Sequence, residues 1–306
     1  MSQYLQSFIK RNQPAVEEVL RARLPRSSLS AAGHLNEALD YALFPGGKRL
    51  RPMLSLLASD LVAVPRSQAL TLACAVEFLH SSSLIIDDLP GMDDASLRRN
   101  RRTLHLVFGE GVAMLAALAL LNESYGLFAE AGRSSGRPSA VESIIAEAAR
   151  VIGAEGMIGG QAIDIELRTG CADAKTLAGR DLKTTALMRL MMTAGAYACG
   201  AEAADTRALS DFGECLGRAF QICDDLLDVG VGSEVTGKSA EQDLRHLRVT
   251  SVALLGIPGA RRFAEQLVAR GVARLEEQFG RRDETRTLAE AADLVLSRAG
   301  SLWEAA

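Results

Sequence analysis

The chain has 306 residues, 48% of them hydrophobic, so it is long enough to bury a large core within one or two domains. Its formal net charge of −4 and its pI near 5.7 argue against a general nucleic-acid-binding protein. The five cysteines are scattered without a CxxC pair or histidine-paired spacing, which indicates free thiols in a reducing cytoplasm.

The N-terminal sequence and the apolar segments together predict a soluble protein. Residues 1–20 lack the basic start and the apolar centre of a secretory signal peptide. The most apolar stretch, 112–121, has only about half of the ~20 residues that a membrane-spanning helix needs, so it predicts a buried helix. We therefore expect no membrane span and a cytoplasmic location.

Helix-forming residues dominate the whole chain. Ala, Leu, Glu and Arg are frequent, and alternating runs of β-branched residues are missing. The segments between predicted breaks suit helices of about 15–25 residues, several of them apolar on more than one face. No repeat or long linker divides the chain, so we predict one all-α domain over 1–306, a large helical bundle. The predicted breaks are FPGG at 44–47, AVP at 63–65, LPG at 89–91, GRSSGRP at 132–138, GVGSEVTG at 230–237 and GIPG at 256–259.

Four acidic residues gather around the predicted end of one helix. Asp87 and Asp88 end an apolar run, the break at 89–91 follows, and Asp93 and Asp94 come next. Carboxylates are unfavourable at the C-terminal end of a helix, where the helix dipole is already negative. We infer that these carboxylates bind a cation.

A second acidic cluster lies in the segment FQICDDLLD, residues 220–228. On a helix Asp224 and Asp228 are one turn apart, with Asp225 beside them and Gln221 one turn earlier. The alternative is an exposed acidic stripe. Because buried carboxylates need cations or protons, two such clusters on apolar helices favour a site over a stripe.

The neighbouring side chains indicate which cation and which ligand these carboxylates serve. Oxygen ligands with no histidine or cysteine among them favour Mg²⁺, which bridges carboxylates to substrate phosphates. Arg98 and Arg99 can hold phosphate oxygens in bidentate fashion. The segment GGKRLRP at 46–52 adds further basic residues. Together these features predict a diphosphate pocket.

The motifs and their order resemble the trans-isoprenyl diphosphate synthases, the family of bacterial farnesyl and geranylgeranyl diphosphate synthases. The resemblance runs from about residue 35 to 255, and two aspartate-rich motifs in this order form a specific signature. It implies an all-α bundle around a deep central cavity, usually a homodimer, with the two aspartate motifs facing each other across the mouth. The motifs are GGKRLRP, EFLHSSSLIIDDLPGMDD, LRR, GGQAID, KTTAL, FQICDDLLD and GK.

The resemblance also implies a role for each matching residue. Three Mg²⁺ ions would be held by Asp87, Asp93 and Asp224, supported by Asp88, Asp225 and Asp228. The allylic diphosphate would be bound by Arg98, Lys183, Lys238 and Arg248. Isopentenyl diphosphate would be bound by Lys48, Arg51, His80 and Arg99. The reacting carbons would be lined by Thr184 and Gln221, which with Lys183 form the catalytic group.

The implied reaction explains why these residue types are needed. Mg²⁺ and the basic side chains neutralise a leaving diphosphate, so that the allylic carbon–oxygen bond can ionise. The double bond of isopentenyl diphosphate attacks the resulting carbocation, and a proton is then lost. Apolar helices below the aspartates exclude the water that would quench the cation.

The chain departs from the family pattern at several positions. Asn100, Arg101 and Arg102 stand where the family has Gly-Lys-Pro, and Arg248 stands where it has lysine. The remaining departures are Ile86 for a frequent histidine, Ala117-Leu118 for Gly-Asp, and Ser251 for a tyrosine. They leave two alternatives to an active synthase, namely a divergent or non-catalytic partner subunit and, less favoured, a terpene cyclase.

The resemblance also implies that product length depends on the side chains just before the first aspartate pair. Ser82 and Ser83 precede Asp87 by five and four residues, about 6–8 Å along the helix. Farnesyl-type bacterial members commonly carry an aromatic residue at the Ser82 position, which forms the floor of the cavity. The small serine predicts a deeper cavity and geranylgeranyl diphosphate as product. Leu79, Met114 or Leu118 could restore the floor and give farnesyl diphosphate.

Overall fold

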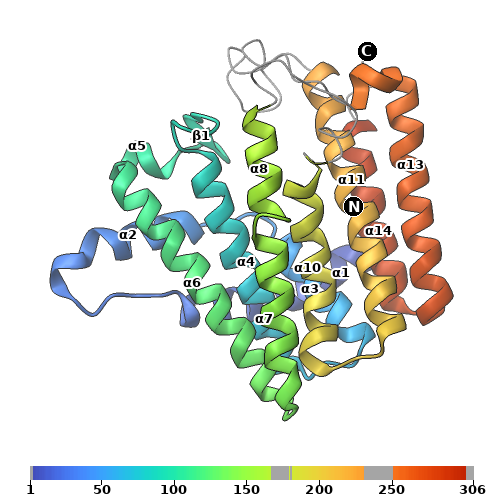
Figure 1. Cartoon of the computed structure of the whole chain (residues 1–306), viewed down its shortest axis with the longest axis horizontal. Coiled ribbons are helices and arrows are strands. Elements are labelled where there is room, and N and C mark those ends of the chain that lie inside the picture. Colours follow the sequence, from blue (N-terminus) through green and yellow to red (C-terminus); the bar gives the residue numbers. More distant parts are fainter. Residues whose placement is uncertain (1–2, 167–178, 180, 231–250, 301–306) are drawn as a thin grey trace.

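The computed structural model describes residues 3–166, 179, 181–230 and 251–300, without the side chains of 228–230 and 298–300. Within this part the chain is a bundle of helices, with one two-stranded hairpin as its only sheet (Figure 1). The elements are α1 (Gln3–Arg23), η1 (Ser30–Ala32), α2 (Gly33–Leu43), α3 (Leu50–Leu61), α4 (Arg66–Asp87), β1 (Leu97–Arg98), β2 (Arg101–Arg102), α5 (Leu104–Phe108), α6 (Glu110–Ser134), α7 (Pro138–Ile152), α8 (Met157–Glu166), α10 (Leu182–Cys199), α11 (Ala203–Gly230), α13 (Ser251–Phe279) and α14 (Asp283–Gly300).

The prediction of an all-α bundle is confirmed, and most predicted breaks fall between helices. The segments 44–47 and 63–65 each separate two helices, and 89–91 separates α4 from the β1–β2 hairpin. The segment 132–138 overlaps the end of α6 and the first residue of α7. At 256–259 the break is a kink instead, because Gly256 has φ 65° and ψ 165° inside α13. The break at 230–237 lies almost wholly outside the described residues. The predicted helix lengths are wrong for α2, α3, α5 and α8, which have 11, 12, 5 and 10 residues, and for α11 and α13, which have 28 and 29.

The sequence does not predict the hairpin of β1 and β2. Leu97 pairs with Arg102 and Arg98 with Arg101, so the connecting turn contains only Arg99 and Asn100. Both turn residues have positive φ, 53° and 60°, as a type I′ turn requires. Asparagine tolerates this conformation best after glycine, which explains how Asn100 can replace the glycine of the family pattern.

The core is built around α4 and α10. On α4, 16 of the 22 residues are buried, from Gln68 to Asp87, because α3 and α6 pack against it. The buried apolar residues form one continuous cluster from Leu5 to Val295. Each fully buried leucine or phenylalanine contributes roughly 1.5–3 kcal/mol to this core. The cluster agrees with a single domain, although the assignment of 1–306 includes residues outside the described part and stays a prediction.

Close packing of α10 and α11 places the second aspartate motif. A Cβ added to Gly217 would lie only 2.8 Å from the Cα of Thr185, so the two helix backbones could not approach as closely with a larger residue. Gln221 lies one turn after Gly217 and therefore on the same face of α11. The glycine thus brings the polar face of α11 against the beginning of α10.

Two described helices, α4 and α6, are long and apolar enough to cross a membrane by length and composition alone. Burial inside the bundle accounts for 72% of the apolar window in α4, as expected for a core helix, but for only 39% in α6. Met114, Leu115 and Leu118 of α6 are 44%, 57% and 57% exposed. The apolar composition of α6 therefore reflects an outer face, and it is only a weak indication of a membrane span.

Candidate active site

The residues of the two aspartate motifs lie at one end of the bundle. The C-terminal ends of α4 and α11 both point to the end where the β1–β2 hairpin lies (Figure 1). The N-terminal end of α10 lies beside both, because Lys183 contacts Asp87 of α4 and Thr184 contacts Gln221 of α11. Motifs more than 130 residues apart in sequence are therefore brought together by helix packing.

The first motif is largely withdrawn from water. Asp87, the last residue of α4, is 9% exposed, and Asp88, the C-cap, is 5% exposed. The backbone N–H of Asp93 donates to the carbonyl of Asp87 at 2.9 Å, which folds the following loop back over the end of the helix. Three predicted metal ligands thus meet at a helix C-terminus, where the dipole disfavours negative charge.

Two cations compensate these buried carboxylates. Lys183 Nζ lies 3.1 Å from Asp87 Oδ2. Arg98 donates from Nε and Nη2 to Asp88 Oδ1, at 3.0 and 2.5 Å. Burial nevertheless raises the pKa of both carboxyl groups above their ordinary values, against the lowering effect of their basic partners. The first motif therefore still favours additional positive charge.

The second motif is connected to the first through consecutive residues of α10. Next to Lys183, the hydroxyl of Thr184 donates to Gln221 Oε1 at 3.1 Å. Gln221 Nε2 in turn donates to Asp225 Oδ1 at 3.3 Å. Asp225 is only 1% exposed, and its other oxygen accepts the backbone N–H of Ser251 at 3.3 Å. One turn of α10 therefore contacts both aspartate motifs.

His80 is buried within the electrostatic influence of four arginines. This imidazole is 5% exposed on α4, and burial lowers its pKa well below the ordinary value. Nearby arginines lower its pKa further, so His80 is neutral and can donate one N–H. Arg51 also lies 5.9 Å from the ring centroid of Phe220, next to Gln221. The arginines that act on His80 are Arg49, Arg51, Arg98 and Arg99.

For five of the predicted site residues, the structure gives only the exposure or no description at all. Lys48 is exposed in the loop before α3, and Asp224 is half-buried on α11. The side chain of Asp228 and the whole of Lys238 and Arg248 lie outside the described residues. The structure therefore brings together most of the predicted site, and the roles of all the site residues stay predictions.

The donor set fits a hard cation, although the described part of the chain holds no preformed metal cage. The predicted ligands on α4 and α11 supply carboxylate oxygens only, which suits Mg²⁺. Within the described residues, no three His, Cys, Asp or Glu side chains are grouped to hold a metal. Lys183 and Arg98 instead contact the first motif. Metal binding would therefore require the carboxylates to exchange these partners.

Helix α8 adds Gln161, a residue of the GGQAID motif for which the sequence indicates no role. Gln161 Nε2 lies 3.6 Å from the sulfur of Met92, in the loop between the two aspartate pairs. The nearby Asp164 is 3% exposed. A buried acid and an amide one turn apart on a short helix are the signal that could have identified α8 as a wall of the site.

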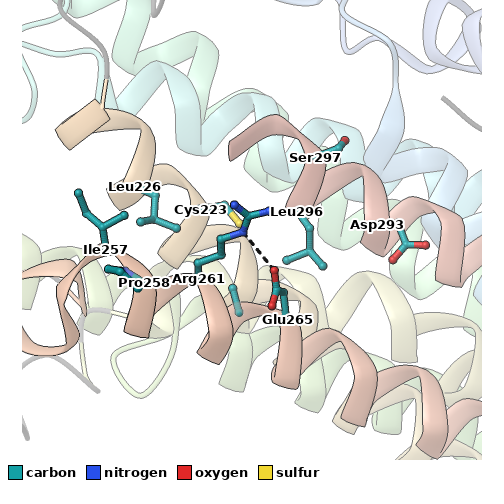
Figure 2. A pocket seen from close by; sticks show the side chains of 10 residues that line it. Cys223, Leu226, Ile257, Pro258, Arg261, Glu265, Asp293, Leu296 and Ser297 are labelled. Atoms are coloured by element: carbon teal, nitrogen blue, oxygen red, sulfur yellow. Dashed lines mark hydrogen bonds and ion pairs between the residues drawn. The ribbon is translucent and has the colours of Figure 1, made fainter. Parts of the chain in front are cut away.

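A cavity of about 510 Å³ lies elsewhere, between α11, α13 and α14 (Figure 2). Cys223 lines it and, being two residues before Asp225, lies about 160° away around α11. Its lining is mainly apolar. It also contains an ion pair, in which Arg261 Nε lies 3.2 Å from Glu265 Oε1 (Figure 2). Burial raises the pKa of the Cys223 thiol to about 11. None of the predicted site residues lines this cavity.

The chain is similar to known prenyl diphosphate synthases over most of its length. The family model for polyprenyl synthetase matches residues 32–284. A farnesyl diphosphate synthase from Geobacillus stearothermophilus is 38% identical over 263 residues, which cover 84% of this chain and 86% of that protein. A chloroplastic geranylgeranyl pyrophosphate synthase from Catharanthus roseus is 40% identical over 242 residues, 76% of this chain and 66% of that protein. The apo crystal structure of an FPP/GFPP synthase from Zymomonas mobilis superposes with a TM-score of 0.83 at 31% identity, covering 95% of this chain and 98% of that one.

The raised pKa of Asp87 has a testable effect on stability. The folded state disfavours the ionised form of Asp87, so this carboxylate lowers the free energy of unfolding of the metal-free protein above the raised pKa. The destabilisation disappears as the pH falls and Asp87 becomes protonated. We expect Asp87→Asn to raise the melting temperature of the metal-free protein at pH 7, with a gain that shrinks toward about pH 4. Asp94→Asn, an exposed change in the same loop, is the control and should leave the pH dependence unchanged. A lower melting temperature for Asp87→Asn at pH 7 would show that the ion pair with Lys183 outweighs burial.

Proposed function

Because the chain belongs to the polyprenyl synthetase family, we propose that it is a short-chain trans-prenyltransferase that joins isopentenyl diphosphate to an allylic diphosphate. The observation that carries this proposal is the contact of Lys183 with Asp87 and of its neighbour Thr184 with Gln221. These contacts bring a cation and a hydroxyl of α10 against the two acidic motifs, which supports a site for the ionisation of a diphosphate ester.

The aspartates are proposed to hold Mg²⁺ against the diphosphate of the allylic substrate. Asp87 and Asp93 would hold two ions and Asp224 a third, with Asp88, Asp225 and Asp228 in support. When bound, these ions would neutralise the diphosphate as it leaves. The raised pKa of Asp87 and of Asp88 supports the proposal, since both carboxylates favour additional positive charge.

The basic residues are proposed to divide between two diphosphates. Lys183 and Arg98, which now contact the first aspartate motif, would turn to the allylic diphosphate together with Lys238 and Arg248. Arg51, Arg99 and Lys48 would bind isopentenyl diphosphate, with the neutral imidazole of His80 donating one further hydrogen bond.

The reaction then follows from charge and position. The allylic carbon–oxygen bond breaks, and its electron pair leaves with the diphosphate held by Lys183 and Arg98. The double bond of isopentenyl diphosphate attacks the carbocation, and the new cation loses a proton to the departed diphosphate. Thr184 and Gln221 would line the reacting carbons and exclude water, while their mutual hydrogen bond fixes their positions.

The division of the pocket predicts which Michaelis constant each basic residue controls. Arg51→Ala should mainly raise the KM for isopentenyl diphosphate, and Lys183→Ala mainly that for the allylic substrate. Losing one charge-assisted contact should cost about 1.5–3 kcal/mol in either case. Steady-state kinetics with each substrate varied in turn measures both constants. An increase of the same KM in both variants would contradict the proposed division.

Ser82 is proposed to set the product length. Its hydroxyl donates to the carbonyl of Ala117 at 2.8 Å, so it faces α6. Met114 and Leu118 are exposed on the outer face of α6, so within one chain they do not form a floor below it. A small side chain at this helix interface supports a deeper cavity and a twenty-carbon product over a fifteen-carbon one.

Product identification tests both the activity and the length. The protein is incubated with Mg²⁺, isopentenyl diphosphate and farnesyl diphosphate, and the alcohols are identified after phosphatase treatment. We expect the wild type to give geranylgeraniol and Ser82→Tyr to stop at farnesol, while Ser83→Thr serves as a conservative control. A wild type that makes farnesol from shorter primers but does not extend it would show that another residue sets the length. Cyclic hydrocarbons would identify a terpene cyclase, and no product with any primer would identify a non-catalytic partner subunit.

A homodimer is proposed to form through the outer faces of α5 and α6. Exposed apolar residues gather there, whereas monomeric proteins rarely expose contiguous apolar patches of this kind. They are Leu106, Val107, Met114, Leu115 and Leu118, between 40% and 57% exposed. A second copy of the chain would cover this face. The cytoplasmic location stays a prediction, which cell fractionation tests.

The dimer can be tested by placing charge on this face. Leu115→Glu combined with Leu118→Glu should convert a dimer of 65.2 kDa, twice 32.6 kDa, to a monomer, because unpaired buried carboxylates are costly. Light scattering coupled to size-exclusion chromatography gives the mass. Leu254→Glu on α13, where the leucine is 61% exposed, is the matched control and should stay dimeric. A dimer that survives the double substitution would place the interface elsewhere.

A further inference from the structure

The C-terminal end of α2 is the meeting point of two loops that carry substrate-binding residues in the proposed function. The last carbonyls of any α-helix have no partner within the helix, and the negative end of its dipole attracts cations. Here two arginines from different segments, Arg49 and Arg101, donate to carbonyls at the end of α2. Neither arginine is assigned to a substrate.

Arg49 fixes the first loop. Its Nη2 donates to the carbonyl of Leu43 at 2.7 Å, its Nη1 to Glu77 at 2.7 Å and its Nε to Glu17 at 2.7 Å. The side chain is only 1% exposed. A Cβ at Gly46 would lie 1.9 Å from the guanidinium carbon, so glycine is required for Arg49 to pass. The neighbouring basic residues of this loop are therefore held in place.

Arg101 fixes the hairpin to the same helix end. Its Nη1 donates to the carbonyls of Phe44 and Tyr41, at 2.9 and 3.3 Å. Its guanidinium carbon lies 3.8 Å from the centroid of the Tyr41 ring, within the range of a cation–π contact. The Tyr41 hydroxyl donates back to the carbonyl of Arg102 at 2.9 Å. The hairpin and α2 are thus joined in both directions.

Because of the hairpin register, the attachment of Arg101 to α2 also fixes the positions of Arg98 and Arg99. Arg101 pairs with Arg98 across the hairpin, and Arg99 is in the turn beside them. A Cβ at Gly47 would lie 3.3 Å from the Arg99 guanidinium carbon, so the turn sits against the first loop. Because the basic residues of the two loops repel one another, their separation depends on a separate attachment.

We propose that Arg101 is a positioning residue, which clamps the hairpin to α2 and so sets the distance between Arg99 and the segment that carries Lys48, in the loop, and Arg51, in the first turn of α3. The proposal rests on the proposed isopentenyl diphosphate site. It also gives a role to a departure from the family pattern, which has lysine here. A planar guanidinium can stack on Tyr41 while it donates to two carbonyls, whereas an ammonium group acts as a point charge.

The test compares Arg101→Gln with Arg102→Gln, which removes the same charge one residue away from an exposed side chain. Isothermal titration calorimetry with isopentenyl diphosphate measures binding without turnover, and steady-state kinetics separates KM from kcat. We expect Arg101→Gln to weaken isopentenyl diphosphate about tenfold with kcat within about twofold, and Arg102→Gln to change neither by more than about twofold. Arg101→Lys should recover part of the affinity.

Further variants make the result decisive. Tyr41→Phe removes only the hydroxyl contact to the hairpin and should weaken isopentenyl diphosphate in the same direction, by about threefold. Melting temperatures identify any variant that fails to fold, in which case Tyr41→Phe alone decides the matter. Equal affinities for Arg101→Gln and Arg102→Gln would overturn the proposal if Arg51→Ala still weakens isopentenyl diphosphate. If Arg51→Ala also has no effect, the proposed site itself is wrong.

Discussion

Burial of carboxylates at the C-terminal end of α4 is the constraint on which the rest of the site depends. Asp87 and Asp88 are almost fully withdrawn from water at the negative end of a helix dipole. Leaving such charges unpaired costs several kcal/mol each, so the fold must supply cations from other elements. Lys183 comes from α10 and Arg98 from the hairpin, which explains why both segments converge on this helix end.

The same constraint explains how the site can respond to substrate. Its basic residues are already close to the first aspartate motif and neutralise it only in part, since burial keeps both carboxyl pKa values raised. A metal–diphosphate complex would supply cations to the carboxylates and anions to Lys183 and Arg98 at the same time. The ion pairs of Lys183 with Asp87 and of Arg98 with Asp88 would then be exchanged for contacts of the same charge.

Much of this arrangement could be predicted from sequence because it depends on periodicity and charge. Helical spacing placed Gln221 beside Asp225, and the structure shows their hydrogen bond. The hairpin was not predictable. Its strands have only two residues each, too few for an alternating apolar pattern, and its turn uses positive φ at Arg99 and Asn100 without a glycine. The partners of Arg101 were hidden for another reason, because two of its three contacts are backbone carbonyls, which the sequence does not mark.

The orientation of α6 shows a further limit of sequence reasoning. Apolar residues on several faces of a helix indicate burial, but they do not say which face meets the same chain and which meets a second one. Leu118 could be expected either below Ser82 or outside the bundle, and it is 57% exposed on the outer face. The packing of α4 against α6 decides between these two positions of Leu118. The hydroxyl of Ser82 donates to the backbone carbonyl of Ala117, so the face of α6 that carries Leu118 points away from α4.

We propose that one turn of α10 serves both aspartate motifs when substrate binds. A crystal structure of the protein with Mn²⁺ and inorganic diphosphate tests it most directly, because anomalous scattering locates the metal independently of the chain. We expect metal bound to Asp87 and to Asp224, with Lys183 Nζ moved from Asp87 to a phosphate oxygen. Diphosphate bound away from Asp87, with the Lys183–Asp87 pair still intact, would contradict it.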